Sequence, residues 1–131
     1  MFVVLLLAVG SILSAAAQTN TVTWTGNVND KWETKENWSP QVVPDANTHV
    51  IIGPGPFQNL PESIQDNNNE KNRAECLSLT IGGGSSEVNL TVENRNGLHI
   101  ATDLNILPNG RLHNRKSKIY IKGNCSTCCY C

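Results

Sequence analysis

The sequence of 131 residues is poor in aromatic side chains and carries almost no net charge. Aromatic residues make up 5% of the chain, and the formal net charge is −1. A chain so close to neutral has little bulk electrostatic attraction for nucleic acid. No window follows a 3.6-residue apolar period, and no apolar run beyond residue 13 approaches the roughly 20 residues of a membrane helix. These absences point away from helical, membrane-spanning and nucleic-acid-binding proteins.

The one long apolar run lies at the N-terminus. Residues 2–13 are almost continuously apolar, and Ala15 and Ala17 fit the small-x-small rule for signal-peptide cleavage. We predict a signal peptide over residues 1–17, because the run is shorter than a membrane anchor. The mature chain of about 114 residues is long enough for one domain. We expect it to be secreted, without stable membrane insertion after cleavage.

Short runs of alternating apolar residues fill the second half of the chain. They cover residues 77–81, 88–92, 98–100, 104–106 and 119–121. This alternation predicts half-buried strands, and Gly- and Asn-rich turns separate them. Two earlier strands are predicted at residues 19–25 and 49–52, and the polar residues 61–75 predict a long loop.

The spacing of these runs is regular. Leu77, Leu98 and Ile119 follow one another at equal intervals, which places the segments LSLTI, LHIAT and IYIKG in register. A fixed period of roughly 20 residues with strand-type units predicts a solenoid, in which each coil buries its apolar face against the next. A β-sandwich with evenly spaced strands is the alternative.

A solenoid needs atypical units at its ends, because a terminal coil exposes an apolar cross-section and unpaired strand edges. Trp24, Trp32 and Trp38 are the only tryptophans, and all lie in a stretch outside the repeat. A tryptophan buries about 150–250 Å². We therefore predict that these three rings cap one end of the stack. The alternative is a sugar platform of exposed rings.

The motif WTG-x5-W-x4-NWS, followed by VP and VII, also lies in this stretch, and LTI and LTV repeats come after it. Over about residues 22–123 the chain resembles the opening of secreted, modular surface proteins of the Bacteroidetes. The matching residues at the front are Trp24, Thr25, Gly26, Trp32, Asn37, Trp38, Ser39, Val43, Pro44, Val50, Ile51 and Ile52. Those in the repeats are Leu79, Thr80, Ile81, Leu90, Thr91, Val92, Gly97, Leu98 and Gly110.

The resemblance implies an all-β fold, a short right-handed parallel β-helix of about three coils with an N-terminal Trp-rich cap. It implies a structural or adhesive role and no catalytic residue, metal or cofactor. A weaker likeness, to the extracellular N-terminal region of amnionless, implies a receptor fragment as an alternative. The expected divisions are a signal peptide (1–17), the cap and first strands (18–60), a polar loop insertion (61–75), the coils (76–123) and a Cys-rich tail (124–131).

Five cysteines are present: Cys76 stands alone, and the tail contains Cys125, Cys128, Cys129 and Cys131. An export signal favours disulfides over zinc or redox chemistry. Because the number is odd, at least one thiol is free or pairs with another chain. The alternatives are crosslinking between copies through the tail, local pairing with Cys76 joined to the tail, metal capture, and the start of a longer Cys-rich domain.

The remaining ionisable residues form no known catalytic motif. His49, His99 and His113 do not form an HExxH arrangement, and strand alternation points His99 outward. Glycoside hydrolysis needs two carboxyl groups about 5–10 Å apart across a cleft, and three coils leave little room for a groove. The acidic residues considered are Asp30, Glu33, Glu36 and Asp103. We predict that the protein is not an enzyme.

Two surface features remain. N-glycosylation sequons begin at Asn37, Asn89 and Asn124, so a glycoprotein is expected in a glycosylating host. A basic stretch contains Arg111, Arg115, Lys116, Lys118 and Lys122. Alternation predicts several of these cations on one sheet face, either as a contact for acidic polysaccharide or as a solvated outer face.

The sequence therefore predicts a secreted, non-enzymatic structural or adhesive module of the cell surface or extracellular matrix. A carbohydrate-binding module is the main alternative. The expected partners are other surface proteins or extracellular glycans, with disulfide-linked self-association through the tail.

Overall fold

The structure is a computed structural model that describes residues 20–63, 73–93 and 97–127. Within these ranges the chain forms twelve strands and one 3-10 helix, η1 (Lys35–Asn37), but no α-helix. No helix in this part of the chain is long and apolar enough to cross a membrane. The predicted signal peptide, most of the 61–75 insertion and three tail cysteines (Cys128, Cys129 and Cys131) lie outside the described residues.

The strands form three sheets, each built from segments far apart in the sequence. Sheet A contains, in spatial order, β12 (Cys125–Thr127), β9 (Leu104–Ile106), β6 (Ser78–Ile81), β3 (Thr48–Ile52), β1 (Asn20–Trp24) and β2 (Trp38–Ser39). Sheet B contains β10 (Gly110–Arg115), β7 (Val88–Glu93) and β4 (Glu62–Ser63). Sheet C contains β11 (Lys118–Ile121), β8 (Gly97–Ile100) and β5 (Ala74–Cys76).

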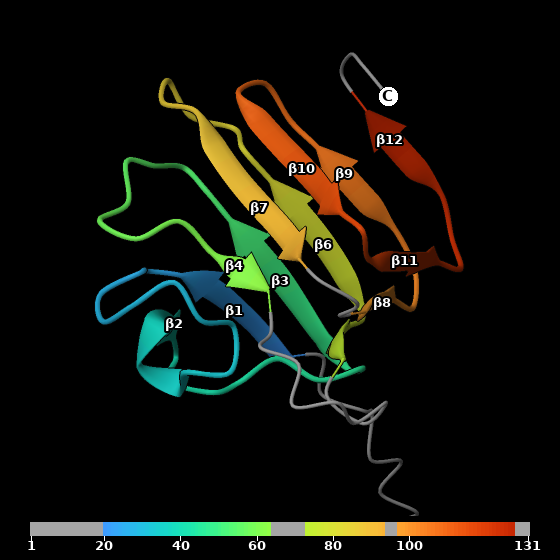
Figure 1. The fold of residues 1–131 in the computed structure, drawn as a ribbon, viewed down its shortest axis with the longest axis horizontal. Helices are drawn as coiled ribbons and strands as arrows, with labels where there is room; N and C mark the ends of the chain where they lie inside the picture. Colours follow the sequence, from blue (N-terminus) through green and yellow to red (C-terminus); the bar gives the residue numbers. More distant parts are fainter. Residues whose placement is uncertain (1–19, 64–72, 94–96, 128–131) are drawn as a thin grey trace, which may run out of the picture.

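The chain visits sheets A, B and C in turn and then begins the next coil. All strand pairs between coils are parallel, and only β2 runs antiparallel, beside β1. The predicted all-β fold is confirmed: the strands form a parallel β-helix of about four turns. In Figure 1 the coils rise from blue β1 to red β12. The partial turns that contain β1 and β12 explain why the stack exceeds the three coils expected.

The core consists of columns of inward side chains, one from each coil. In sheet A, Val22 lies opposite Val50, which lies opposite Leu79, and Leu79 lies opposite Leu104. All four are at most 2% exposed. Burying an apolar side chain of this size stabilises the fold by about 1.5–3 kcal/mol. Each coil is therefore stabilised by the coils on either side of it.

The predicted repeat register is right for two segments and wrong for the third. LHIAT and IYIKG pair in sheet C, where Leu98 lies opposite Ile119. LSLTI does not join them, because Leu77 begins the segment that becomes β6 in sheet A, and β5 lies beside β8 instead. The register differs from the prediction because the turns between strands differ in length. Six residues (82–87) join β6 to β7, whereas three (107–109) join β9 to β10, so the coils differ in length.

The segment 61–75 is also more structured at its ends than predicted. β4 and β5 lie there, and they join sheets B and C. Strands of two and three residues are too short to show alternation in a polar context, which is why the sequence predicts only a loop. In β5, Ala74 and Cys76 are nonetheless fully part of the core, at 3% and 0% exposure.

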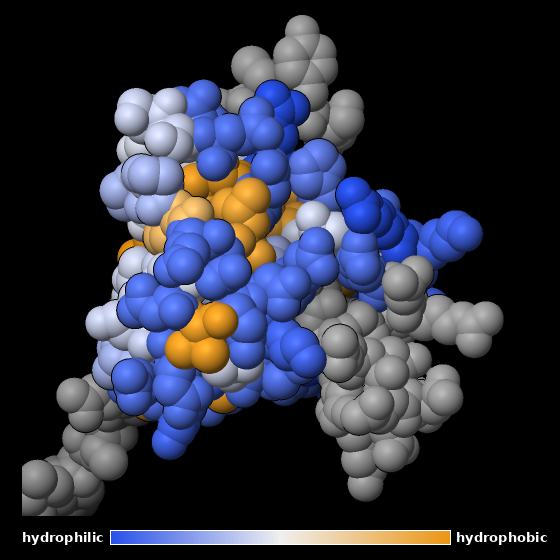
Figure 2. All heavy atoms as spheres, turned by 60° about the vertical axis from the view of Figure 1, so that its left-hand side comes forward, coloured by the Kyte–Doolittle hydropathy of each residue, from blue (hydrophilic) through white to orange (hydrophobic). Residues whose placement is uncertain are grey.

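The large apolar side chains at the surface belong to the cap segment, the turns and β11. They are Val28, Val42, Val43, Leu60, Leu107 and Tyr120. Figure 2 shows one side of the molecule, where separate apolar patches interrupt a mainly hydrophilic surface. This side of the molecule presents no broad, continuous apolar face.

The corner between sheets A and B requires glycine. Gly82 follows β6 with φ of +97°, a conformation that side chains disfavour. A Cβ atom on Gly82 would lie 2.6 Å from the backbone nitrogen of Gly110 on the next coil. Successive coils therefore approach too closely at this corner for any side chain.

We predict that Gly82→Ala lowers the free energy of unfolding by about 2 kcal/mol or more, because it adds backbone strain and a clash between coils. Urea denaturation measures this change. Gly97→Ala is the control, since its Cβ would lie 3.3 Å from the nearest atom, Cβ of Arg73. We expect the control to change stability by less than about 1 kcal/mol. Equal losses in the two variants would contradict this account of the corner.

Candidate functional site

The three tryptophans lie together at the β1 end of the stack. Trp24 ends β1, Trp38 begins β2 beside it, and Trp32 lies in the connection between them. The ring centroids of Trp24 and Trp38 are 4.9 Å apart at an interplanar angle of 81°, and those of Trp32 and Trp38 are 4.9 Å apart at 74°. Such edge-to-face pairs contribute about 0.5–1.5 kcal/mol each beyond burial.

Hydrogen bonds hold two of these rings in place. Nε1 of Trp24 donates to the carbonyl oxygen of Asn59 at 2.9 Å, and Nε1 of Trp38 donates to the carbonyl oxygen of Trp32 at 2.8 Å. In return, Nδ2 of Asn59 donates to the carbonyl oxygen of Gly26 at 2.7 Å. The cap is therefore closed by two segments that are far apart in the sequence, Trp24–Gly26 and Asn59.

The burial of the rings decides between the two interpretations of the tryptophans. Their exposed fractions are 1% for Trp24, 2% for Trp32 and 1% for Trp38. A ring that stacks on a sugar needs an accessible face. The sugar-platform alternative is therefore wrong for these rings, and the arrangement is that of an end cap packed on the first coil.

Asn37 is the polar centre of the cap. Its side chain is fully buried, and Oδ1 accepts hydrogen bonds from the backbone N–H groups of Val28 at 3.0 Å and Asn29 at 3.1 Å. Its Nδ2 donates to Oδ1 of Asn29 at 2.6 Å and to the carbonyl oxygen of Lys31 at 3.0 Å. Expecting a glycan on this sequon was wrong for the folded chain, because the amide nitrogen is enclosed and already bonded.

We predict that Asn37→Ala lowers the free energy of unfolding by about 2–4 kcal/mol, because it leaves backbone N–H groups of the cap without an acceptor. Thermal and urea unfolding report the loss. The matched control is Asn124→Ala, where the side chain is exposed, and it should change stability by less than about 0.5 kcal/mol. If both variants unfolded alike, Asn37 would not be organising the cap.

The other two sequons lie outside the core. Asn89 is half-buried in β7, and its Nδ2 donates to Oε1 of Glu87 at 3.1 Å. Asn124 is exposed in the turn before β12. Of the three sequon asparagines, Asn124 is thus the most accessible in the folded chain.

The two cysteines in the described ranges differ in surroundings and are not bonded to each other. Cys76 is 0% exposed in β5, and its Sγ donates to the carbonyl oxygen of His99 at 3.8 Å. Burial raises the pKa of the Cys76 thiol to about 12, so the thiol stays protonated and unreactive. Cys125 is exposed in β12. These positions make Cys125, not Cys76, the accessible thiol of the pair.

The three histidines lie on three different sheets: His49 on sheet A, His99 on sheet C and His113 on sheet B. Nδ1 of His49 lies 2.6 Å from Oγ of Ser78, while His113 is exposed in β10. Partial burial raises the pKa of Glu62, helped by the nearby charges of Glu93 and Asp30. In the part of the chain that the structure describes, no three His, Cys, Asp or Glu side chains gather as a metal site.

The basic stretch is split between two sheets, so the prediction of one basic face was wrong for the stretch as a whole. Arg111 and Arg115 lie on β10 of sheet B, whereas Lys118 lies on β11 of sheet C and Lys122 follows it. Lys116 occupies the turn between them with φ of +61°. The coil is not flat, and the turn after β10 carries the chain onto a different face.

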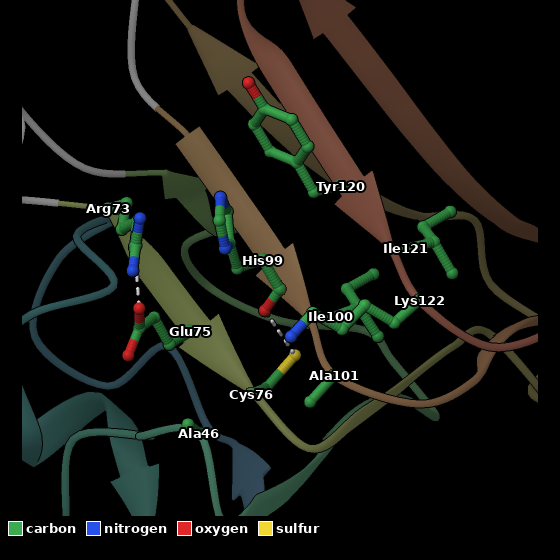
Figure 3. Close-up of a pocket in the computed structure, with 10 residues that line it drawn as sticks. All are labelled: Ala46, Arg73, Glu75, Cys76, His99, Ile100, Ala101, Tyr120, Ile121 and Lys122. Carbon is green, nitrogen blue, oxygen red and sulfur yellow. Dashed lines mark hydrogen bonds and ion pairs between the residues drawn. The ribbon is translucent and has the colours of Figure 1, made fainter.

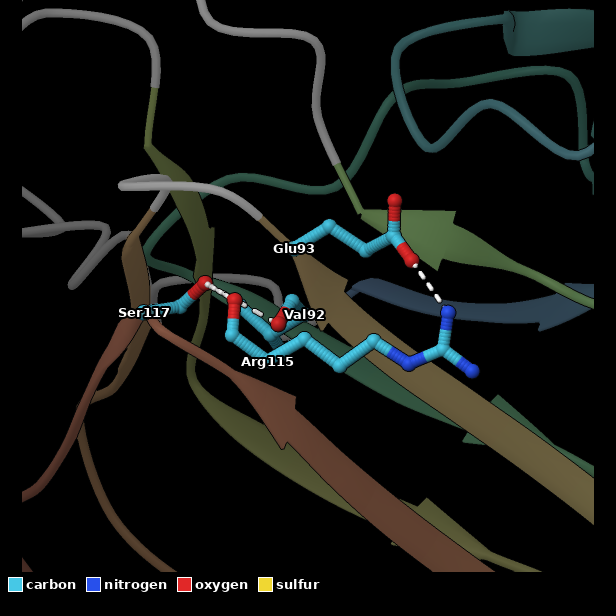
Figure 4. A network of polar contacts seen from close by, with 4 residues as sticks. All are labelled: Val92, Glu93, Arg115 and Ser117. Atoms are coloured by element: carbon cyan, nitrogen blue, oxygen red, sulfur yellow. Dashed lines mark hydrogen bonds and ion pairs between the residues drawn. The ribbon is translucent and has the colours of Figure 1, made fainter.

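The two arginines are moreover neutralised by the preceding coil. Nε of Arg111 lies 3.0 Å from Oε2 of Glu87, and Nη1 of Arg115 donates to Oε1 of Glu93 at 2.8 Å (Figure 4). Beside the second pair, Oγ of Ser117 donates to the carbonyl oxygen of Val92 at 2.9 Å. The ion pairs on sheet B thus connect neighbouring coils.

Sheet C carries a cavity of about 400 Å³ that the sequence did not indicate. Its polar lining comes from Arg73 and Glu75 at β5, His99 on β8, and Tyr120 and Lys122 at β11 (Figure 3). His99 points outward, as predicted, and is half-exposed. Partial burial lowers its pKa, and the positive charges of Arg73 and Lys122 lower it further, against Glu75. The imidazole is therefore neutral near pH 7.

Comparison with known proteins gives one match. Residues 23–126 match the model of a family described as a domain of unknown function, DUF8693. No curated protein and no solved structure matches the chain.

Proposed function

We propose that this chain, which belongs to the DUF8693 family, is a secreted, non-enzymatic structural or adhesive module. It acts as a rigid β-helical scaffold that joins a second copy at one end and presents its outer faces to partners. The resemblance of its cap motif to secreted surface proteins supports this role, and so does the difference between the two ends of the stack.

That difference is visible in the core columns. Leu98 and Ile100 of β8 are 0% and 1% exposed, whereas Ile119 and Ile121, which lie opposite them in β11, are only partly buried. In sheet B, Leu112 is likewise only partly buried. No coil lies beyond these side chains in the described part of the chain. Closing this end would add apolar burial worth about 25 cal/mol per Å².

The same end carries unpaired strand edges. Within the described residues, β10, β11 and β12 each have a neighbouring strand on one side only. An exposed strand edge can accept a strand from another chain. The opposite end also has edge strands, β2, β4 and β5, but three buried tryptophans pack there and an isolated bridge joins Lys31 to Glu62 of β4. Contact with another protein is therefore favoured at the β10–β12 end.

We assign this end to a second copy of the chain because of where Cys125 lies. Cys125 is opposite Leu104 and so continues an inward core column, yet it is exposed. Two copies that meet end to end about a twofold axis present the same patch to each other. Such a contact covers both open ends and brings the two Cys125 side chains together. The dimer then displays two sets of outer faces, which strengthens binding to a repetitive partner.

We predict that the purified mature protein runs as a dimer in non-reducing electrophoresis and as a monomer after reduction. Cys125→Ser should abolish the covalent dimer. Joint replacement of the tail residues Cys128, Cys129 and Cys131 by serine should leave it intact. Light scattering under reducing conditions tests whether the contact persists without the bond. A dimer lost in the tail variant but kept in Cys125→Ser would contradict the proposed contact.

We also predict that a secretory host exports the protein and that the exported chain begins at Gln18. N-terminal sequencing of the culture medium checks this, because signal peptidase would cut after Ala17. Retention of the chain in the cell with Met1 still present would contradict the extracellular role. The dimer test and this one are independent.

A carbohydrate-binding module remains the second candidate function. The tryptophans no longer support it, since they are buried. The cavity on sheet C does support it, because cations, an exposed aromatic ring and hydrogen-bonding groups converge there.

A further inference from the structure

The β-helix brings three outward side chains from three coils into one row. Glu75 of β5 lies opposite His99 of β8, and His99 lies opposite Tyr120 of β11. The rings of His99 and Tyr120 have centroids 4.5 Å apart at an interplanar angle of 57°. Tyr120 is 48% exposed, the highest value among the aromatic side chains in the described core and coils. An aromatic face is thus held in place yet accessible.

Two small residues, Ala46 and Ala101, line the hollow beside this row. The missing bulk leaves a space of about 400 Å³, which is within the range of about 300–1,000 Å³ for small-molecule sites.

The charges around the hollow are mainly positive. Arg73 and Lys122 line it from opposite coils, and Glu75 is the one acidic side chain in its lining. Nε of Arg73 donates to Oε1 of Glu75 at 2.6 Å, which fixes the planar guanidinium at the rim. Figure 3 shows these groups around the outer side of β5, β8 and β11. A ligand with one negative charge suits this balance better than a polyphosphate, which Glu75 repels.

We propose that this site binds an acidic saccharide, a sugar of the uronate type. The sugar carboxylate pairs with Lys122 and Arg73, its C–H face lies on the ring of Tyr120, and its hydroxyls bond to His99 and Glu75. Charge-assisted bonds to a carboxylate and an amphipathic ring are the groups that such a ligand requires. The inference rests on the second candidate function, a carbohydrate-binding module, and it does not require the end-to-end dimer.

An open position on a sheet face favours a polymer over an enclosed metabolite. The cavity lies at sheet C and is lined from all three of its strands, β5, β8 and β11. A chain of sugars can pass across such a face, with one acidic unit in the hollow. Bulk charge does not explain the site, because the formal net charge of the chain is −1.

We expect tetragalacturonate to bind in isothermal titration calorimetry and neutral maltotetraose to bind at least about tenfold more weakly, since it lacks the carboxylates. Affinity for tetragalacturonate should fall as salt rises. Equal affinity for the two sugars would overturn the proposal, and so would no binding to tetragalacturonate.

Variants locate the site. Tyr120→Ala should weaken tetragalacturonate binding about tenfold, whereas Tyr120→Phe, which keeps the ring, should retain it. Lys122→Gln should weaken binding about threefold to fivefold. Lys116→Gln removes the same charge from a turn outside the cavity and should change affinity by less than about twofold. Equal losses in the two lysine variants would mean non-specific attraction and overturn the site.

The same titration with Cys125→Ser separates this inference from the proposed dimer. We expect this variant, which cannot form the Cys125 disulfide, to bind one tetragalacturonate per chain with unchanged intrinsic affinity. If the protein binds tetragalacturonate but never dimerises, the result contradicts the proposed end-to-end contact and leaves the saccharide site standing. A dimer that binds no tetragalacturonate would contradict the saccharide site alone. Circular dichroism confirms that each variant is folded.

Discussion

The structure depends on the contact between inward apolar side chains of successive coils. No coil has a core of its own: Leu79 is buried because Val50 lies on one side of it and Leu104 on the other. Such a stack is as stable as its contacts between neighbours, and its ends are its weak points. The Trp cap and the Asn37 network close one end. At the other end the last described coil keeps Ile119 and Ile121 partly exposed.

Different parts of the molecule therefore have different roles. Core columns and the cap hold the shape, and ion pairs such as Arg115–Glu93 add contacts between coils on sheet B. Sheet C instead holds outward groups that are spaced by the coil rise and left partly accessible, including His99 and Tyr120. A rigid face of this kind fixes the positions of its side chains before a ligand arrives, which reduces the entropy lost on binding.

Much of the fold could be predicted from the sequence, because alternation and evenly spaced apolar runs can be read directly along the chain. The choice of sheet for each strand could not be predicted, because it depends on the length of the turns. The turn between β9 and β10 is three residues shorter than the turn between β6 and β7, so LSLTI lies on a different sheet from LHIAT and IYIKG. The cavity was missed for the same reason. Arg73, His99 and Tyr120 become neighbours only once the register is known. The prediction of a glycan at Asn37 was wrong for the folded chain, because a three-residue motif carries no information on burial.

Hydrogen exchange, read peptide by peptide on the reduced Cys125→Ser protein, tests the central claim that stacking is supported at one end and open at the other. The account predicts strongest amide protection in β3 and β6, protection close to theirs in β1 beside the cap, and a steady decline through β9 and β10 to β12. Dimer formation in the unmodified chain should then raise protection in β10–β12 alone. Uniform protection across all coils, or a cap that exchanges faster than β12, would contradict the account.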